Sequence, residues 1–498
     1  MAPIITTSFS QPSLGRHGHS IDLFSGSKPT QQTSPPRTPP AGVHKDSASD
    51  IEHLSVSRFP PVDPGEEPHV AIIGCGYVGE HLIKRFSSRY SVLGFEVSTE
   101  RVESLRKVYD QEDSRVSFTL APKDLSRATH FLVSVPTLLL EDKSINTSYI
   151  QLALTTIGRY ARRGSTIVVE SSVAVGMTRQ LVGPLAKQKG FYAGMSPERV
   201  DPGRTEPPAQ RIPKIISGLD DVVPGSLEAI TRLYSPVFDT IFPVSKPEVA
   251  EMMKLYENCQ RMVCIAYANE MADACAPHGI DPYEVCRAAA TKPFGYMPYT
   301  PSLGVGGHCI PVNPYYLLSN SDFPLLEACT EKMWQRPVEI GQKALELLGN
   351  IDGREEQMRP AIHHVDSCMD MYCAQTVHNA ALENKDMAIE VTSRRSSTSR
   401  ARVLIVGIGF KPGQSVLSNS PGQKLAQSLA DSGRVDVMFA DPLVEQSAIP
   451  LIPRLDDESW NKEVLETFDM IIVAIKQVGP DLDVLQELDG PKIQMWCA

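Results

Sequence analysis

The sequence predicts an α/β protein: two doubly wound parallel-sheet domains joined by a long central helix, with a disordered N-terminal tail. Three observations indicate this fold. Strand-like apolar runs alternate with helical patterns after residue 67, the same alternation resumes after residue 400, and a long helical stretch lies between them. The 498 residues would make roughly two to four domains of about 100 to 200 residues each.

Residues 1–66 form the predicted tail. They mix Ser, Thr, Pro, Gly and His with hardly any apolar periodicity, and they include the pairs Pro35-Pro36, Pro39-Pro40 and Pro60-Pro61. Such a segment cannot bury enough apolar surface to offset the entropy of ordering it. We therefore expect it to be disordered.

Two segments carry the predicted sheets. In residues 67–246 the runs HVAIIG, SVLGFE, HFLVSVP and STIVVE are typical of buried parallel strands, with helix-like segments between them. In residues 400–498 the runs RVLIVGIGF, VDVMFAD and DMIIVAIK repeat this character. The alternation predicts a βαβ arrangement in both segments.

Residues 247–349 form the predicted central region. The stretch from Pro247 to Pro277 contains no internal glycine or proline and has helical apolar spacing, so it is the longest predicted helix. At about 1.5 Å per residue it would span roughly 45 Å, enough to bridge two domains. Residues 350–399 are polar and fit no regular element, so we interpret them as an irregular insertion.

Composition excludes several classes of protein. A formal charge of −11 argues against a broad nucleic-acid-binding surface, although it permits a local pocket for a small anion. Ten cysteines without a C-x-x-C pair favour a reducing, cytoplasmic setting, and no apolar run approaches the roughly 18 to 20 residues of a membrane span. His363, His364, Cys368 and Cys373 match no standard zinc spacing, so we expect no metal site.

A glycine motif follows the first predicted strand. Gly74, Gly76 and Gly79 form G-x-G-x-x-G, in which the glycines permit a tight turn, close approach of a pyrophosphate and close helix packing. Glu96 ends the next strand, where a carboxylate would bind both ribose hydroxyls and repel a 2′-phosphate. This arrangement predicts a Rossmann-like domain that binds NAD rather than NADP.

Cys309 lies in a loop rich in glycine, proline and aromatic residues, TKPFGYMPYTPSLGVGGHCIPVNPYYLL. In such a loop a cysteine thiolate can attack an aldehyde, with His308 or a lysine lowering its pKa. A small buried cysteine without chemistry is the alternative interpretation, and composition alone does not decide between them.

One face of the long helix is polar. Lys254, Asn258 and Arg261 recur at i, i+4 and i+7, and a lysine beside an amide can stabilise an oxyanion. The alternative is a solvated face on which Glu251 and Glu257 pair with these cations.

Two further segments combine carboxylates with hydroxyl or cationic side chains. VVESSVAVGMTRQ contains Glu170, Ser171 and Ser172, and MSPERVDPGR contains Glu198, Arg199 and Arg204. A carboxylate beside an arginine suits base catalysis on an anionic substrate, whereas each segment read alone also fits a turn with a surface ion pair.

Together these segments resemble the UDP-glucose/GDP-mannose dehydrogenase family, most closely its branch that oxidises UDP-N-acetylhexosamines. The similarity runs from about His69 to Gly349 and resumes weakly from Arg402. Its most specific pieces are the Cys309 loop and SPERVDPG, followed by IPKIISG and EMMKLYENCQRMVCIAYANE.

The resemblance implies two NAD-dependent hydride transfers that convert a sugar C6 alcohol to a carboxylate through an aldehyde and a cysteine thioester. It implies that Cys309 is the nucleophile, that Lys254 and Asn258 stabilise the oxyanion, and that Glu198 handles protons during hydrolysis. The remaining implied catalytic residues are Asn313 and Ser172; the cofactor set is Gly74, Gly76, Gly79, Glu96, Arg101, Thr137, Ser171 and Lys411; and the substrate set is Arg199, Arg261, His308 and Gly306. It also implies a UDP-sugar substrate, UDP binding by residues 400–498, and a homodimer or higher homo-oligomer built on the central helix.

Several positions depart from the family pattern. Asn313 replaces an aspartate and cannot serve as a base, and Ser172 replaces a threonine. In GIGFKPGQSVLSNSP Lys411 remains, but two acidic positions are lost and Ser418 replaces an arginine. These departures leave open a relative that binds NAD and a nucleotide sugar with weak or no turnover. The sequence also leaves open UDP-glucose as the substrate, and a hydroxyacid dehydrogenase that stops after one hydride transfer.

Overall fold

The computed structural model describes residues 59–63, 65–109, 115–201, 206–349 and 400–497. The predicted insertion at 350–399, and all but the last few residues of the predicted tail, lie outside the described residues. His363, His364, Cys368 and Cys373 therefore lie outside them as well.

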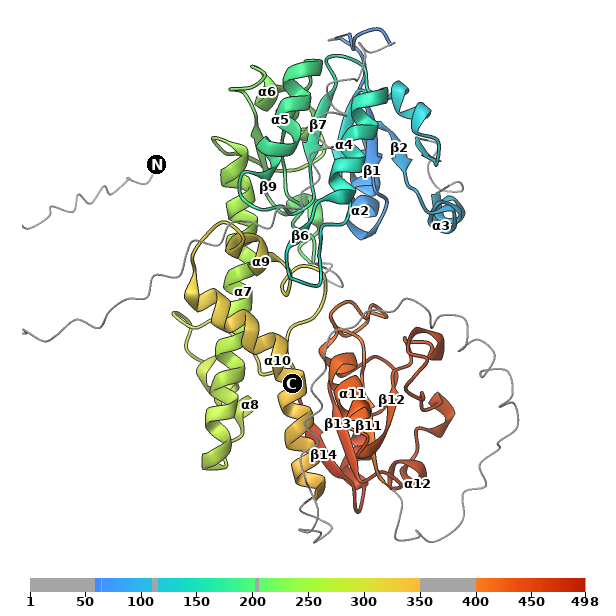
Figure 1. The fold of residues 1–498 in the computed structure, drawn as a ribbon, viewed down its shortest axis with the longest axis vertical. Helices are drawn as coiled ribbons and strands as arrows, with labels where there is room; N and C mark the ends of the chain where they lie inside the picture. The colour runs from blue at the N-terminus through green and yellow to red at the C-terminus, as the bar shows by residue number, and fades with distance from the viewer. Residues whose placement is uncertain (1–58, 64, 110–114, 202–205, 350–399, 498) are drawn as a thin grey trace, which may run out of the picture. The chain divides into compact units, whose positions relative to one another are not determined.

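The first domain is built on an eight-stranded sheet with the order β10-β9-β8-β7-β4-β1-β2-β3 (Figure 1). Neighbouring strands pair in parallel except β8 and β9, which are antiparallel. The strands are β1 (His69–Ile73), β2 (Ser91–Phe95), β3 (Val116–Thr119), β4 (His130–Val133), β7 (Thr166–Val169), β8 (Tyr192–Met195), β9 (Lys214–Gly218) and β10 (Ile241–Pro243). A short antiparallel hairpin, β5 (Leu138–Leu139) and β6 (Ile145–Asn146), follows β4.

Helices cover both faces of this sheet because its strands alternate their side chains between two cores. Ala71 and Ile73 of β1 point into one core, and Val70 and Ile72 point into the other. The first core is closed by α4 (Ser148–Tyr160) and α5 (Met177–Lys189), and the second by α2 (Tyr77–Phe86), α3 (Thr99–Tyr109) and α6 (Ser226–Tyr234). The predicted doubly wound arrangement is thus present in the first domain.

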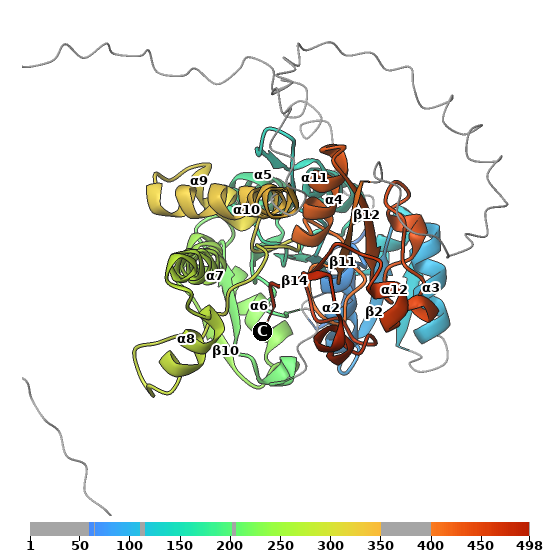
Figure 2. The same cartoon turned by 90° about the horizontal axis from the view of Figure 1, so that it is seen from below.

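The central region is helical. Helix α7 (Pro247–Cys275) has 29 residues and contacts α10 (Pro324–Gly349); Figure 2 views α7 nearly end-on. The shorter helices are α8 (Pro282–Ala289) and α9 (Asn313–Leu318). Leu326 and Met333 of α10 pack in the core of α7 and α9, whereas Ile340 and Ala344 further along α10 belong to the core of the second sheet. Helix α10 therefore belongs to both cores.

The second domain has a four-stranded parallel sheet with the order β12-β11-β13-β14. Its elements are β11 (Ala401–Val406), α11 (Pro421–Asp431), β12 (Val435–Ala440), α12 (Lys462–Leu465), β13 (Met470–Val473) and β14 (Lys492–Met495). Helices α10 and α11 cover one face, and α12 lies in the core of the other.

All seven strand-like runs recognised in the sequence are strands, and the α/β fold with parallel sheets is confirmed. Strands β3, β5, β6, β8, β9, β10 and β14 were not predicted. Strands β5 and β6 have only two residues each, and the others, among them VSFT, YAGM and KIQM, do not form a continuous apolar run.

Candidate active site

The glycine motif forms the turn between β1 and α2. Gly74 has φ +89°, and its N–H donates to the Phe95 carbonyl at 2.9 Å. A Cβ at Gly79 would lie 2.0 Å from the Gly74 carbonyl oxygen, so α2 packs directly against the turn. A Cβ at Gly76 would meet no atom within 4 Å, so this backbone borders open space at the N-terminus of α2. The turn has the accessible backbone that a pyrophosphate requires.

Glu96 lies beside the same turn, directly after β2. Its Oε2 accepts from the Cys75 N–H at 2.9 Å, and its Oε1 accepts from the Val97 N–H at 2.7 Å. Arg101 of α3 donates from Nε to the Cys75 carbonyl at 2.9 Å and pairs with Glu80 of α2. A carboxylate held between the glycine turn and the end of the second strand fits the ribose of a dinucleotide.

The segments after β4 and β7 meet at the carboxyl edge of the sheet. Thr137 Oγ1 donates to the Ser172 carbonyl at 2.9 Å, and Ser171 Oγ donates to the Val135 carbonyl at 2.7 Å. Tyr316 of α9 donates to the Thr137 carbonyl at 2.6 Å. Thr137, Ser171 and Ser172 therefore lie together, and α9 ties them to the segment that carries Cys309.

The Cys309 loop packs against the segment that follows β11. A Cβ at Gly306 would lie 2.8 Å from Phe410 Cβ, so only glycine fits there without a shift. The Gly307 N–H donates to the Ser418 carbonyl at 2.8 Å, and Ser418 Oγ lies 2.6 Å from His308 Nε2. Burial lowers the pKa of His308. The second domain thus holds this loop in place.

Two cations act on the Cys309 thiol. Cys309 keeps contact with solvent, yet the protein atoms around it remove enough hydration to raise the pKa of its thiol. The charges of Lys254 and Arg261 oppose that rise, whereas the Asp201 carboxylate adds to it. Lys254 is 8% exposed, and burial lowers the pKa of its ammonium. The predicted nucleophile and the predicted oxyanion lysine therefore interact.

Two amides lie beside this pair. Asn258 on α7 is 3% exposed and donates from Nδ2 to Oδ1 of Asn313, which is 2% exposed. The Asn313 N–H donates to the Cys309 carbonyl at 2.9 Å, so the amide pair is anchored to the nucleophile's own backbone.

The segment after β8 brings further charges to the site. Arg199 donates to Glu257 of α7 at 2.5 Å and to the Pro213 carbonyl at 3.0 Å. Lys411 of the second domain pairs with Asp201 at 3.0 Å. Arg204 lies outside the described residues.

A buried cluster lies behind Glu198. Its Oε1 accepts from the Arg199 and Val200 N–H groups, and its Oε2 accepts from Lys214 Nζ at 2.8 Å. Lys214 also donates to Glu170 at 2.7 Å. Burial would raise the pKa of Glu198, but Lys214 and the backbone donor lower it overall. Burial, against the opposing effect of Lys214, raises the pKa of Glu170 to about 7.

The structure thus brings Cys309, Lys254, Asn258, Asn313 and Arg261 together, with Glu198 acting on Lys254 through its charge. The solvated-face alternative for α7 is wrong. Glu251 is 1% exposed and accepts from the Gly176 and Thr178 N–H groups, and Glu257 pairs with Arg199.

Lys214 was missed as a site residue. Lys214 is the first residue of β9, within IPKIISG. A lysine at the start of an otherwise apolar run could have indicated a buried charged side chain. Tyr77 of α2 was missed too; its pKa is raised by burial and by Asp201, Glu198 and Cys309, so it faces the same charges.

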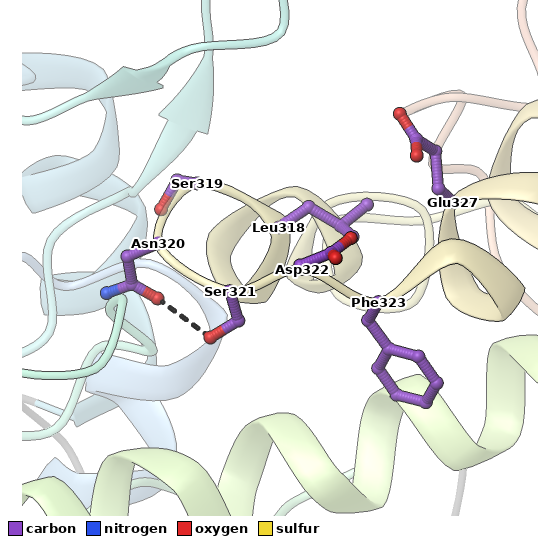
Figure 3. Close-up of a pocket in the computed structure, with 7 residues that line it drawn as sticks. All are labelled: Leu318, Ser319, Asn320, Ser321, Asp322, Phe323 and Glu327. Carbon is purple, nitrogen blue, oxygen red and sulfur yellow. Dashed lines mark hydrogen bonds between the residues drawn. The ribbon is translucent and has the colours of Figure 1, made fainter. Parts of the chain in front are cut away.

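Two hollows on the described surface are not lined by Cys309. One, of about 390 Å³, lies between the end of α9 and the start of α10 (Figure 3). It is lined by Leu318, Ser319, Asn320, Ser321, Asp322, Phe323 and Glu327. The other, of about 270 Å³, lies between α10 and α11. Neither brings predicted catalytic side chains together.

In the described part of the chain, none of the helices is both long enough and apolar enough to cross a membrane. Among the same residues, His, Cys, Asp and Glu side chains form no group of three or more suited to a metal ion.

Comparison with known proteins gives matches to a family profile, to named relatives and to solved structures. The sequence profile of the UDP-glucose/GDP-mannose dehydrogenase family, NAD binding domain, matches residues 68–238, and that of the central domain matches residues 248–333. UDP-N-acetyl-D-glucosamine 6-dehydrogenase of Pseudomonas aeruginosa is 31% identical over 394 residues, covering 75% of this chain and 83% of that protein.

UDP-N-acetyl-D-mannosamine dehydrogenase of Pyrococcus horikoshii is 28% identical over 428 residues, covering 81% of this chain and 88% of that protein. A solved structure of the P. horikoshii UDP-D-ManNAc dehydrogenase superposes with a TM-score of 0.67 at 25% identity, covering 86% and 95% of the two chains. A UDP-glucose dehydrogenase from Pyrobaculum islandicum shares the fold, with a TM-score of 0.66 at 19% identity over 86% of this chain and 98% of that one.

Proposed function

Because the chain belongs to the UDP-glucose/GDP-mannose dehydrogenase family and is an NAD-dependent oxidoreductase, we propose that it oxidises the C6 alcohol of a UDP-sugar to the uronate. The observation that carries this proposal is the Cys309 thiol with the Lys254 ammonium acting on it and the Asn258–Asn313 amide pair anchored beside it. One alcohol, two NAD and one water would give one carboxylate, two NADH and three protons.

NAD supplies the hydride acceptor for both oxidations. We assign it to the domain of residues 67–246, where Gly74, Gly76 and Gly79 would receive the pyrophosphate at the start of α2. Glu96 would take the ribose, with Arg101 holding the turn through the Cys75 carbonyl. Thr137 and Ser171 would shape the opposite end of the site at β4 and β7.

Cys309 would attack the aldehyde carbon through sulfur to form a thiohemiacetal. Lys254 and Asn258 would stabilise the negative charge on the former carbonyl oxygen. Loss of the second hydride would leave a thioester on Cys309. Glu198 would then take a proton from water placed near Ser172, and the sulfur would leave as the C–O bond forms.

The nucleotide part of the substrate would meet cations from both domains. We assign UDP recognition to residues 400–498 together with Arg199, Arg261, His308 and the backbone at Gly306. Lys411 faces this region through Asp201. These cations would form a local positive site, although the chain as a whole carries a formal charge of −11.

The preferred substrate would be UDP-N-acetylglucosamine or UDP-N-acetylmannosamine. The relatives from P. aeruginosa and P. horikoshii carry those activities in their names and cover three quarters or more of the chain. UDP-glucose is the alternative.

A homodimer or a multiple of one is the proposed assembly. Helix α7 exposes Tyr256, Tyr267 and Met271 at 70%, 63% and 44%, on one side of the helix. Phe294, after α8, is 70% exposed. Apolar surface of this extent favours cover by a second copy. A cytoplasmic location, where free cysteines such as Cys309 stay reduced, remains a prediction.

One substrate panel tests the function. The full chain is given NAD with UDP-N-acetylglucosamine, UDP-N-acetylmannosamine or UDP-glucose, and NADH is counted per sugar. Two NADH per sugar with one of these substrates is the expected result, whereas one NADH indicates a simple alcohol dehydrogenase. Absence of NADH, with ligand-induced thermal stabilisation retained, supports instead a binding protein without turnover, for which Asn313 and Ser418 are the reason.

A further inference from the structure

A charged cluster beneath the site is almost completely buried. Lys214 Nζ lies 2.7 Å from Glu170 Oε2 and 2.8 Å from Glu198 Oε2. The side chains of Lys214, Glu170 and Glu198 are 3%, 0% and 10% exposed. Tyr234 of α6, fully buried, donates its hydroxyl to Glu170 Oε1.

The charges in this cluster do not balance. Two carboxylates and one ammonium sum to −1, and a net charge without solvent is unfavourable in a protein interior. Uptake of one proton makes the cluster neutral. The cluster can therefore accept one proton. The proton would enter through Glu198, because its side chain is the most exposed of the three.

Glu198 alone is a weak base for this task. Lys214 bonds to it directly, and the neighbouring Arg199 and Val200 N–H groups donate to its other oxygen. Each of these donors stabilises the carboxylate and so makes it less ready to hold a proton. Glu170 is the better acceptor, with a pKa of about 7 because of its burial. A path from the weak base to the stronger one runs through the lysine that contacts both.

We infer that Glu170, Lys214 and Glu198 form a proton relay, in which Glu170 stores the proton that Glu198 removes from the hydrolytic water. This inference rests on the proposed function, because it concerns hydrolysis of the Cys309 thioester. Lys214 and Glu170 act through Glu198 and do not touch the substrate.

During hydrolysis of the Cys309 thioester, one proton would pass from water into the cluster. A C–O bond forms between water and the acyl carbon while one proton of the water passes to Glu198. Lys214 gives one of its protons to Glu170 and takes the proton from Glu198. Glu198 is thereby ionised again, and Lys214 keeps its positive charge. The C–S bond breaks, and the Cys309 sulfur leaves with the electron pair. The second proton of the water stays on the product carboxyl and ionises to solvent, and the stored proton leaves through Glu198 afterwards.

Glu170→Gln tests the relay because it removes the store while the side chain keeps its size. Both hydride transfers should proceed, so mixing with NAD and the sugar that the wild type oxidises should give a burst of two NADH per Cys309. Steady-state kcat should then fall by about 10- to 100-fold, within the range of general acid–base effects. The acyl enzyme should accumulate and be visible as added mass in intact-protein mass spectrometry.

The pH profile separates a relay from a structural role. Because Glu170 must be ionised to accept a proton, wild-type kcat should fall as the pH drops through about 7. In Glu170→Gln this acid limb should disappear or move to lower pH. The groups that face Glu170 are Lys214 of β9, Tyr234 of α6 and, through Lys214, Glu198; Lys254 of α7 acts on Glu198.

Two further variants complete the test. Lys214→Arg keeps the positive charge but does not release a proton, so it should also hydrolyse the thioester slowly; full activity in this variant would overturn the relay. Glu248→Gln removes a carboxylate from an ion pair with Arg179, outside the cluster, and should keep kcat within about twofold. Thermal stabilisation by NAD confirms that each variant is folded.

The outcomes distinguish the two proposals. A wild type that forms no NADH with any UDP-sugar contradicts the proposed function. A wild type that turns over, with Glu170→Gln giving the same kcat, no burst and an unchanged acid limb, contradicts the relay alone.

Discussion

Replacing Lys214 with methionine is expected to destabilise the first domain strongly. Methionine keeps most of the side-chain volume but leaves Glu170 and Glu198, 0% and 10% exposed, without the ammonium that lies 2.7 and 2.8 Å from them. Removing one partner of a buried ion pair costs about 3–5 kcal/mol. For a domain of this size 1 kcal/mol corresponds to roughly 2–4 °C, so the melting midpoint should drop by about 6–20 °C at pH 8.

The loss should depend on pH with a definite sign. Burial pushes the pKa of both carboxyls upward, and in wild type Lys214 opposes this effect. Without Lys214 both folded-state pKa values lie above those of the unfolded chain, so the penalty is absent where both carboxyls are protonated in either state. It grows as the pH rises through the ordinary carboxyl range and above it.

The assay is thermal unfolding of wild type and variant, followed by circular dichroism between pH 5 and pH 8. Arg232→Met is the matched control, because Arg232 pairs with Glu228 on the surface of α6 and the two side chains are 68% and 74% exposed. Its midpoint should stay close to that of wild type. A Lys214→Met midpoint within about 2 °C of wild type at pH 8, or a loss independent of pH, would refute the reasoning.

Three other substitutions address the site directly. Cys309→Ser should abolish acid formation, measured as the uronate product, while thermal stabilisation by NAD is retained; uronate formation by this variant would exclude the thioester route. Gly79→Ala would place a Cβ 2.0 Å from the Gly74 carbonyl oxygen, so NAD titration should show binding at least about tenfold weaker, and unchanged affinity would contradict the placement of the cofactor. Asn313→Asp adds a carboxylate beside Asn258 and the Cys309 backbone, so alkylation of Cys309 by iodoacetamide should require a higher pH than in wild type. An unchanged alkylation profile would show that position 313 does not act on the thiol.

The sequence predicted the strands that repeat a buried apolar pattern, because that pattern is local. Runs such as HVAIIG and RVLIVGIGF are continuously apolar, which indicates a strand that is buried on both faces. The edge strands β10 and β14 have the sequences IFP and KIQM, which are not continuous apolar runs of this kind. Their pairing depends on the neighbouring strand, not on their own residues.

The site could be predicted only in part, for the same reason. Lys254 and Asn258 were recognisable because helical spacing places them on one face. Lys214 was not, because its role depends on Glu170 and Glu198, which lie 44 and 16 residues away in the sequence and meet it only in the folded sheet. The contact between Ser418 and His308 could not be predicted either, because the two residues are 110 positions apart in the sequence.

The asparagine at position 313 would have two opposite consequences for the proposed chemistry. An amide cannot accept a proton, so this side chain offers no base near Cys309. The amide also keeps the pKa of the Cys309 thiol from rising further, because it carries no charge. The charges that act on the thiol are those of Lys254 and Arg261, which lower its pKa, and that of Asp201, which raises it. A thiolate is favoured by cations and disfavoured by burial, and burial is the larger effect here. In the proposed mechanism, Asn313 would therefore favour the thiolate form of Cys309, and proton removal would fall to Glu198 with Lys214 and Glu170 behind it.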